Sequence, residues 1–147
     1  MIKIISHYYS WTIIYLEKNI INTMIADSPK VLTIVLTEGP YRSQYADMAY
    51  EIALSALNKK YRVNLFLYMD ATHIPKKEQN PHSFPNVAAK FRNLINKGAD
   101  VRACVRCATA RGHSCAKKPY IKGVAITNVY DLAGWIKESH QVISLGC

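Results

Sequence analysis

Two cysteines in a C-x-x-C spacing are the residues of this sequence most suited to chemistry. Cys104 and Cys107 lie in the run D-V-R-A-C-V-R-C-A-T-A-R-G at residues 100–112. Three arginines flank the thiols: Arg102, Arg106 and Arg111. Cationic neighbours favour the thiolate, the form of cysteine that attacks electrophilic sulfur. We therefore expect an ionised Cys104, open to solvent or to a neighbouring subunit.

The same residues allow two other chemistries. Cys104, Cys107, His113 and Cys115 are four potential zinc ligands, although their spacing matches no familiar zinc finger. A C-x-x-C motif near a βαβ pattern is also typical of thioredoxin-like dithiols. In those proteins the motif follows the first strand, whereas here it follows the third predicted strand. A thiol–disulfide or zinc-binding cluster therefore stays open as an alternative.

Length and composition limit the class of protein. The chain has 147 residues, 50% of them hydrophobic, which fits one domain with a substantial core. The net charge of +9 would suit an anionic partner, but the chain has no recognised nucleic-acid motif, so a nucleic-acid partner is not favoured. No apolar run reaches the ~18 residues of a membrane-spanning helix. We expect a cytoplasmic protein without membrane attachment.

The elements that must position the cysteines follow from residue periodicity. Strands are expected at residues 31–37, 63–69, 101–105, 124–127 and 141–145. Helices are expected at residues 43–60, 87–97 and 129–136, with a polar loop at 70–85. Asn128, with Asp131, is expected to cap the last of these helices. This alternation predicts an α/β fold, a three-layer α/β/α sandwich with a mainly parallel five-stranded sheet. Residues 29–147 form the predicted domain, and residues 1–28 a peripheral or flexible N-terminal extension.

Two runs of the sequence resemble a known family. The runs C-V-R-C-A-T-A-R-G (Cys104–Gly112) and I-K-G-V-A-I-T-N-V-Y-D-L-A-G-W-I (Ile121–Ile136) resemble the DsrE/DsrF-like family, which includes TusD and YchN-type proteins. The likeness extends from about Lys30 to Leu145. It implies a DsrEFH-like sandwich related to the flavodoxin-like topology, assembled into homo- or hetero-oligomers. It also implies a cysteine that carries sulfur as a persulfide between partner proteins.

The resemblance assigns roles to individual residues. The carrier cysteine of the family falls on Cys104, and Cys107 matches an auxiliary cysteine of YchN-like members. Cys115 belongs to neither pattern, so its relay role is only a possibility. Persulfide binding is expected from the charge and the predicted topology, not from the resemblance, of four residues at the sheet rim: Arg106, Arg111, Tyr41 and Arg42. Two loop histidines, His73 and His82, are candidate proton donors.

The function that the resemblance implies is sulfur transfer. A Cys104 thiolate would take sulfane sulfur, or thiosulfate, from a donor and yield it to an acceptor thiolate, without a metal or organic cofactor. Donor and acceptor would be TusA-like or rhodanese-like proteins, and the chain would form a homo-oligomer, a trimer or hexamer. The alternative is an oligomeric binding module with a thiol–disulfide or zinc-binding cysteine cluster and a basic face for an anionic partner.

Overall fold

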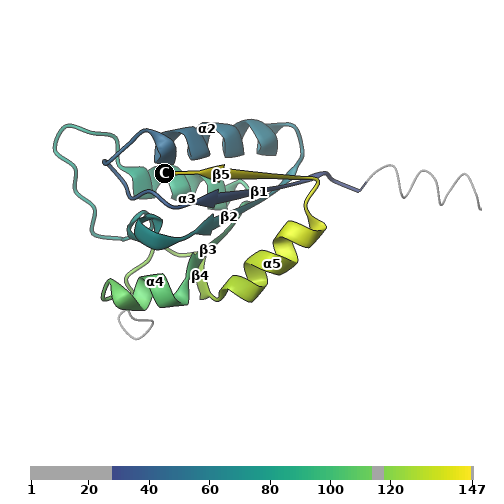
Figure 1. Ribbon diagram of the computed structural model, residues 1–147. Helices are drawn as coiled ribbons and strands as arrows, with labels where there is room; N and C mark the ends of the chain where they lie inside the picture. The colour runs from purple at the N-terminus through teal and green to yellow at the C-terminus, as the bar shows by residue number, and fades with distance from the viewer. Residues whose placement is uncertain (1–27, 114–117, 147) are drawn as a thin grey trace, which may run out of the picture.

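The computed structural model describes residues 28–113 and 118–146. Five strands form one parallel sheet in the order β4-β3-β2-β1-β5 (Figure 1). The strands are β1 (Val31–Leu36), β2 (Arg62–Leu67), β3 (Asp100–Cys104), β4 (Val124–Thr127) and β5 (Gln141–Leu145). The chain builds β2 to β4 outward on one side of β1 and then returns to place β5 on the other side. The reversal lies between β1 and β5, whereas the flavodoxin order reverses between β1 and β3.

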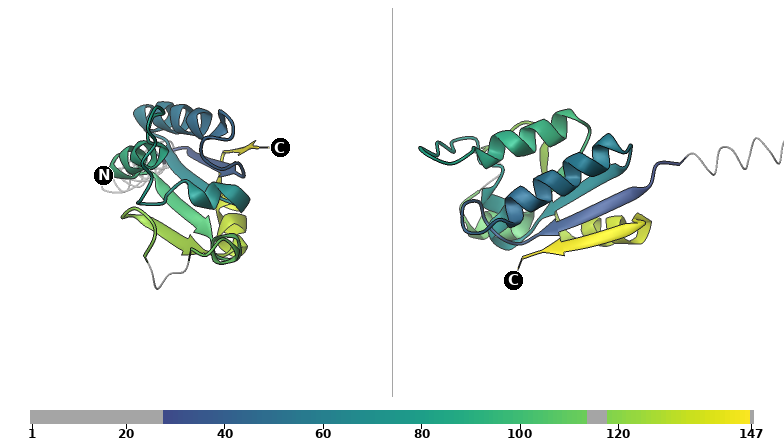
Figure 2. Two further views of the ribbon diagram at one scale, coloured as in Figure 1. Left: turned by 90° about the vertical axis from the view of Figure 1, so that its left-hand side faces the viewer. Right: turned by 90° about the horizontal axis from the view of Figure 1, so that it is seen from above.

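Helices cover both faces of the sheet, which gives three layers (Figures 1 and 2). The helices α2 (Tyr45–Asn58) and α3 (Val87–Asn96) lie on one face, and α4 (Val105–Ala110) and α5 (Val129–Glu138) lie on the other. Helix α2 can approach the sheet closely because its buried face is made only of alanines: Ala46, Ala49, Ala53 and Ala56. The predicted α/β sandwich with a mainly parallel five-stranded sheet is confirmed.

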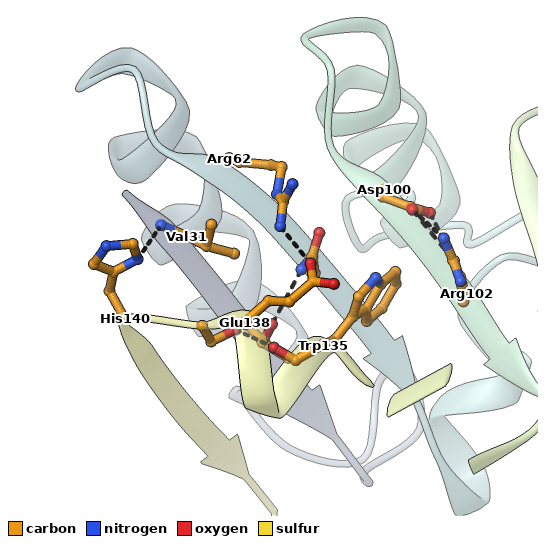
Figure 3. A network of polar contacts seen from close by, with 10 residues as sticks. Val31, Arg62, Asp100, Arg102, Trp135, Glu138 and His140 are labelled. Atoms are coloured by element: carbon orange, nitrogen blue, oxygen red, sulfur yellow. Dashed lines mark hydrogen bonds and ion pairs between the residues drawn. The ribbon is translucent and has the colours of Figure 1, made fainter. Parts of the chain in front are cut away.

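The two faces of the sheet differ in how they are packed. The main core lies under α2 and α3, where Ile34, Leu65 and Phe91 are fully buried. On the α5 side, a small cluster contains only three buried residues: Phe66, Cys104 and Trp135. Polar contacts connect the rest of α5 and the strands, as Figure 3 shows for the ion pair between Arg62 and Glu138 at 2.8 Å. Helix α5 is therefore held by the buried Trp135 ring, by the partly buried Leu132 beside it and by polar contacts.

Most element boundaries agree with the pattern of the sequence. The predicted Asn128 cap is confirmed, because the Asn128 side chain accepts hydrogen bonds from the backbone N–H groups of Tyr130 and Asp131. Two elements differ from the expectation. The predicted loop at 70–85 begins inside a 3-10 helix, η1 (Met69–His73), and Val105 starts α4 rather than ending a strand.

The N-terminal extension predicted at residues 1–28 lies outside the residues that the structure describes, apart from Ser28. Within residues 28–113 and 118–146, no helix is both long and apolar enough to cross a bilayer.

A glycine before β4 gives a direct test of the packing against α3. Gly123 has a φ of +95°, and an added Cβ would lie 2.6 Å from Ile95 Cγ2. We expect Gly123→Ala to lower the free energy of unfolding by about 2 kcal/mol, from backbone strain and the steric clash. Gly134→Ala in α5 is the matched control, because its Cβ would meet open space and should stabilise the helix by about 0.5–1 kcal/mol. Equal effects in urea denaturation would contradict this account.

Candidate functional site

Cys104 is the last residue of β3 and the residue before α4. Its exposed fraction is only 2%, because it packs with Phe66 and with Trp135 of α5. The expectation that Cys104 is open to solvent is therefore wrong for the single chain. The reason is the alternation of side chains along β3, which puts Cys104 on the face that α5 covers.

Cys107 lies in the first turn of α4 and is partly exposed. Its thiol makes hydrogen bonds with the Met69 backbone and with Cys104, so the two free cysteines are neighbours. Burial is the main cause that raises the pKa of Cys107, and the interactions with Cys104 raise it further. The Met69 hydrogen bond and the charge of Arg111 act in the opposite direction. The expected shift toward thiolate is therefore wrong for Cys107, whose resting form is the thiol.

Asp70 pairs with two of the three arginines that were expected to bind a persulfide, Arg111 and Arg42. Arg111 Nε and Nη2 lie 2.8 and 2.7 Å from Asp70 Oδ1, and Arg111 Nη1 donates to the Cys107 carbonyl at 3.2 Å. Arg42 pairs with Asp70 at 3.8 Å and with Glu38 at 3.2 Å. The hydrogen bond from Arg111 is the main cause that lowers the pKa of Asp70. The charges of both arginines are thus largely balanced by carboxylates.

The other predicted site residues are placed differently. The Tyr41 hydroxyl donates to Gln79 Oε1 at 3.0 Å and accepts from the Val87 backbone N–H at 3.3 Å, so it fixes the loop before α3. Arg106 is exposed on α4 and forms no ion pair with the residues that the structure describes. Its charge is not among those that act on the Cys107 thiol, whereas the charge of Arg111 is. Cys115 lies outside the described residues.

A pair of histidines lies at the same edge of the sheet. His113 Nε2 and His73 Nδ1 are 2.9 Å apart, and their rings meet edge to face at 85°. Burial is the main cause that lowers the pKa of each ring, and the charges of Lys76 and Arg111 lower both further. The pair is therefore neutral at pH 7 and shares one hydrogen bond. The other loop histidine, His82, is exposed.

The sequence contained a signal for Asp70, which was missed. Asp70 lies just after β2, and the carboxyl ends of parallel strands meet at one edge of a sheet. Its position beside the cysteines could have been inferred from that rule. Nothing in the sequence pairs His113 with His73, because their contact depends on the path of the chain after α4.

The histidine pair predicts acid sensitivity. Because folding lowers both pKa values, the unfolded chain binds protons more readily than the native protein, and stability falls as pH drops below about 6.5. Between pH 7.5 and pH 5.5, the free energy of unfolding measured with urea should fall less for His73→Asn/His113→Gln than for the wild type. His82→Gln is the control and should keep the wild-type loss. Identical losses in all three proteins would rule out this role.

The zinc alternative depends partly on a residue outside the described ranges. Within residues 28–113 and 118–146, no group of three or more histidine, cysteine, aspartate or glutamate side chains could hold a metal ion. The four ligands expected from the sequence include Cys115, which lies outside these ranges. The other three, Cys104, Cys107 and His113, do not form such a group, so the geometry of the described residues does not support the zinc alternative.

Comparisons with known proteins agree with this architecture. The DsrE/DsrF-like family matches residues 30–145. An uncharacterized protein of Methanopyrus kandleri is 40% identical over 113 residues, covering 77% of this chain and 92% of its own length. An uncharacterized protein of Methanocaldococcus jannaschii is 37% identical over 112 residues, which cover 76% of this chain and 96% of its own length.

Solved structures share the fold. The ychN protein of E. coli superposes with a TM-score of 0.73 at 24% identity, covering 80% of this chain and 100% of its own. A conserved protein of unknown function from Bacteroides thetaiotaomicron gives a TM-score of 0.60 at 17% identity, with coverages of 79% and 95%. The chain thus belongs to the DsrE/DsrF-like family, a sulfur-relay family in general terms.

Proposed function

We propose that this protein is a sulfur carrier that relays sulfane sulfur between partner proteins on its Cys104 and Cys107 pair. The observation that carries the proposal is the contact between two free thiols of unequal exposure at the carboxyl end of β3. Cys107 can be reached from solvent, whereas Cys104 is enclosed by Phe66 and Trp135. One thiol is suited to exchange with a partner and the other to protected storage.

Sulfur is accepted at Cys107 in the first step. The Cys107 thiol loses its proton to solvent, and the thiolate attacks the terminal sulfur of a donor persulfide. The sulfur–sulfur bond of the donor breaks, the donor leaves as a thiolate that takes up a proton, and Cys107 becomes a persulfide. A thiol with a high pKa is a strong nucleophile once ionised, which offsets part of the loss from its small ionised fraction. The Met69 backbone and the charge of Arg111, which both lower the pKa of Cys107, stabilise the anion.

Sulfur moves to Cys104 in the second step. The Cys104 thiolate attacks the terminal sulfur of the Cys107 persulfide, Cys107 leaves as a thiolate, and the proton lost by Cys104 returns to Cys107. Atoms and electrons balance without an oxidant, a metal or an organic cofactor. The same two displacements in reverse pass the sulfur to an acceptor thiolate. The buried position of Cys104 protects the stored persulfide from water-soluble thiols and oxidants.

The partners and assembly proposed here follow the family. Donor and acceptor would be TusA-like or rhodanese-like proteins of the cytoplasm, and copies of this chain would assemble into a trimer or hexamer. A contact between copies would change the exposure of α5 and so the protection of Cys104.

Mass spectrometry of the intact chain tests the function. After incubation with polysulfide, the wild type should gain one sulfur atom, about 32 Da, that a reducing agent removes. Cys104→Ser/Cys107→Ser should gain none, whereas Cys115→Ser/Cys147→Ser, the matched control, should gain as much as the wild type. No gain in the wild type, or full gain in the Cys104→Ser/Cys107→Ser protein, would refute the proposal. Dependence on Cys115 would instead assign that cysteine a relay role.

A further inference from the structure

A groove of about 430 Å³ runs beside β4, away from the two cysteines. Three exposed lysines line it: Lys77, Lys118 and Lys122. Its apolar lining includes Ile121, Val124 and Ile126, and no acidic side chain contributes to it. Within the described part of the chain, none of these lysines forms an ion pair. The groove therefore combines an apolar floor with uncompensated positive charge.

The strand next to the groove is an edge of the sheet. Among the described strands β4 pairs only with β3, and Figure 2 shows it at the end of the sheet opposite β5. An edge strand presents backbone N–H and C=O groups that another extended segment can pair with. The three lysines lie beside this edge. A bound segment could therefore contact the lysine side chains and the backbone groups of β4 at the same time.

The strand beside the groove reaches the level of the cysteines. In the register of β3 and β4, Thr127 lies opposite Cys104, so the end of β4 is level with the candidate site. Neighbouring strands are about 4.8 Å apart, so a segment added outside β4 would lie about 10 Å from β3. On the other side, the Tyr120 ring of the groove packs 5.6 Å from the His113 ring.

We propose that this groove binds an acidic, extended segment of a partner protein, which adds a strand to the outer edge of β4. Glutamate and aspartate side chains of the segment meet the lysines, and its apolar side chains meet Val124 and Ile126. Docking there brings the partner close to the carboxyl end of the sheet, where Cys107 lies. The purpose of docking rests on the proposed sulfur-carrier function, whereas the binding itself does not.

A protein segment fits this groove better than single-stranded RNA does. Binding of unpaired bases depends on exposed aromatic rings on which the bases stack. The aromatic residue of the groove, Tyr120, is only 6% exposed, and the rest of the floor is aliphatic. Alternating acidic and apolar side chains on an extended backbone match the lysines, the aliphatic floor and the strand edge together.

Fluorescence anisotropy of a labelled probe tests the proposal with the full chain. The probe is a peptide of about eight residues that alternates glutamate and valine. We expect saturable binding that weakens with salt and weakens at least about tenfold in Lys77→Glu/Lys122→Glu. Lys59→Glu/Lys137→Glu carries the same charge change on exposed lysines elsewhere and should bind as the wild type does. Equal loss in both variants would overturn the site.

Hydrogen exchange separates strand addition from mere charge attraction. The probe should slow exchange of the β4 amides and leave those of β5 unchanged. Unchanged β4 exchange would overturn the strand-addition geometry, and tighter binding of an oligouridine through the same lysines would overturn the choice of a protein segment.

Polysulfide loading of Lys77→Glu/Lys122→Glu keeps the two proposals apart. Polysulfide is small and does not need the groove, so loading should match the wild type. If the wild type binds the probe but takes up no sulfur, the carrier function fails and the docking site stands.

Discussion

In a protein that carries Cys115→Ser/Cys147→Ser, replacing Cys107 by serine should slow the uptake of sulfur from polysulfide at least about tenfold, because the remaining thiol, Cys104, is buried. Cys107 is the partly exposed member of the pair, whereas Cys104 is 2% exposed behind Phe66 and Trp135. The initial rate of the sulfur mass gain measures the effect. A Cys107→Ser protein that loads at the wild-type rate would show that sulfur reaches Cys104 directly.

Cys104→Ser, made in the same Cys115→Ser/Cys147→Ser protein, gives the complementary result. This variant should accept sulfur at the wild-type initial rate but lose it faster to added glutathione, since the persulfide stays on the exposed Cys107. The variants at Cys107 and Cys104 thus separate the uptake of sulfur from the protection of the stored persulfide. Equal rates of loss from Cys104→Ser and the wild type would remove the storage role from Cys104.

Replacing Trp135 by alanine should both destabilise the protein and expose Cys104. The indole is buried, meets the Phe66 ring edge to face at 6.3 Å and lies under the Arg102 guanidinium at 4.3 Å. Removing a buried aromatic side chain of this size lowers the free energy of unfolding by about 3–5 kcal/mol. Alkylation of Cys104 by iodoacetamide should accelerate at least about tenfold, measured in a protein whose other cysteines are serines.

Trp135→Phe is the matched control for the loss of the indole. It keeps an aromatic ring against Phe66, so it should cost less stability and leave Cys104 largely protected. If Trp135→Ala is folded and Cys104 is alkylated no faster than in the wild type, then α5 is not what encloses the thiol.

The sheet could be predicted from the sequence because its three central strands are short and largely buried. Val31–Leu36 has almost no polar residue, and the alanine spacing in α2 matches one buried helix face. Such periodic signals depend on neighbours within a few residues. The same locality let Asn128 be assigned as a helix cap.

The site was less predictable because it depends on contacts between distant segments. The C-x-x-C motif gives the spacing of Cys104 and Cys107 but not which of them α5 covers. The arginine-rich sequence predicted free positive charge, yet Asp70, 41 residues before Arg111, binds that guanidinium. Charge counted along the sequence therefore overstated the charge available at the thiols.

The donor that Met69 offers to Cys107 belongs to the main chain, and the residue has a φ of +48°. Any amino acid other than proline supplies the same N–H group, so evolution can vary the side chain at this position without losing the contact. Glycine would even relieve the unfavourable dihedral angle. Searches that compare homologues by side-chain identity would overlook this determinant of thiol reactivity, and only backbone geometry reveals it.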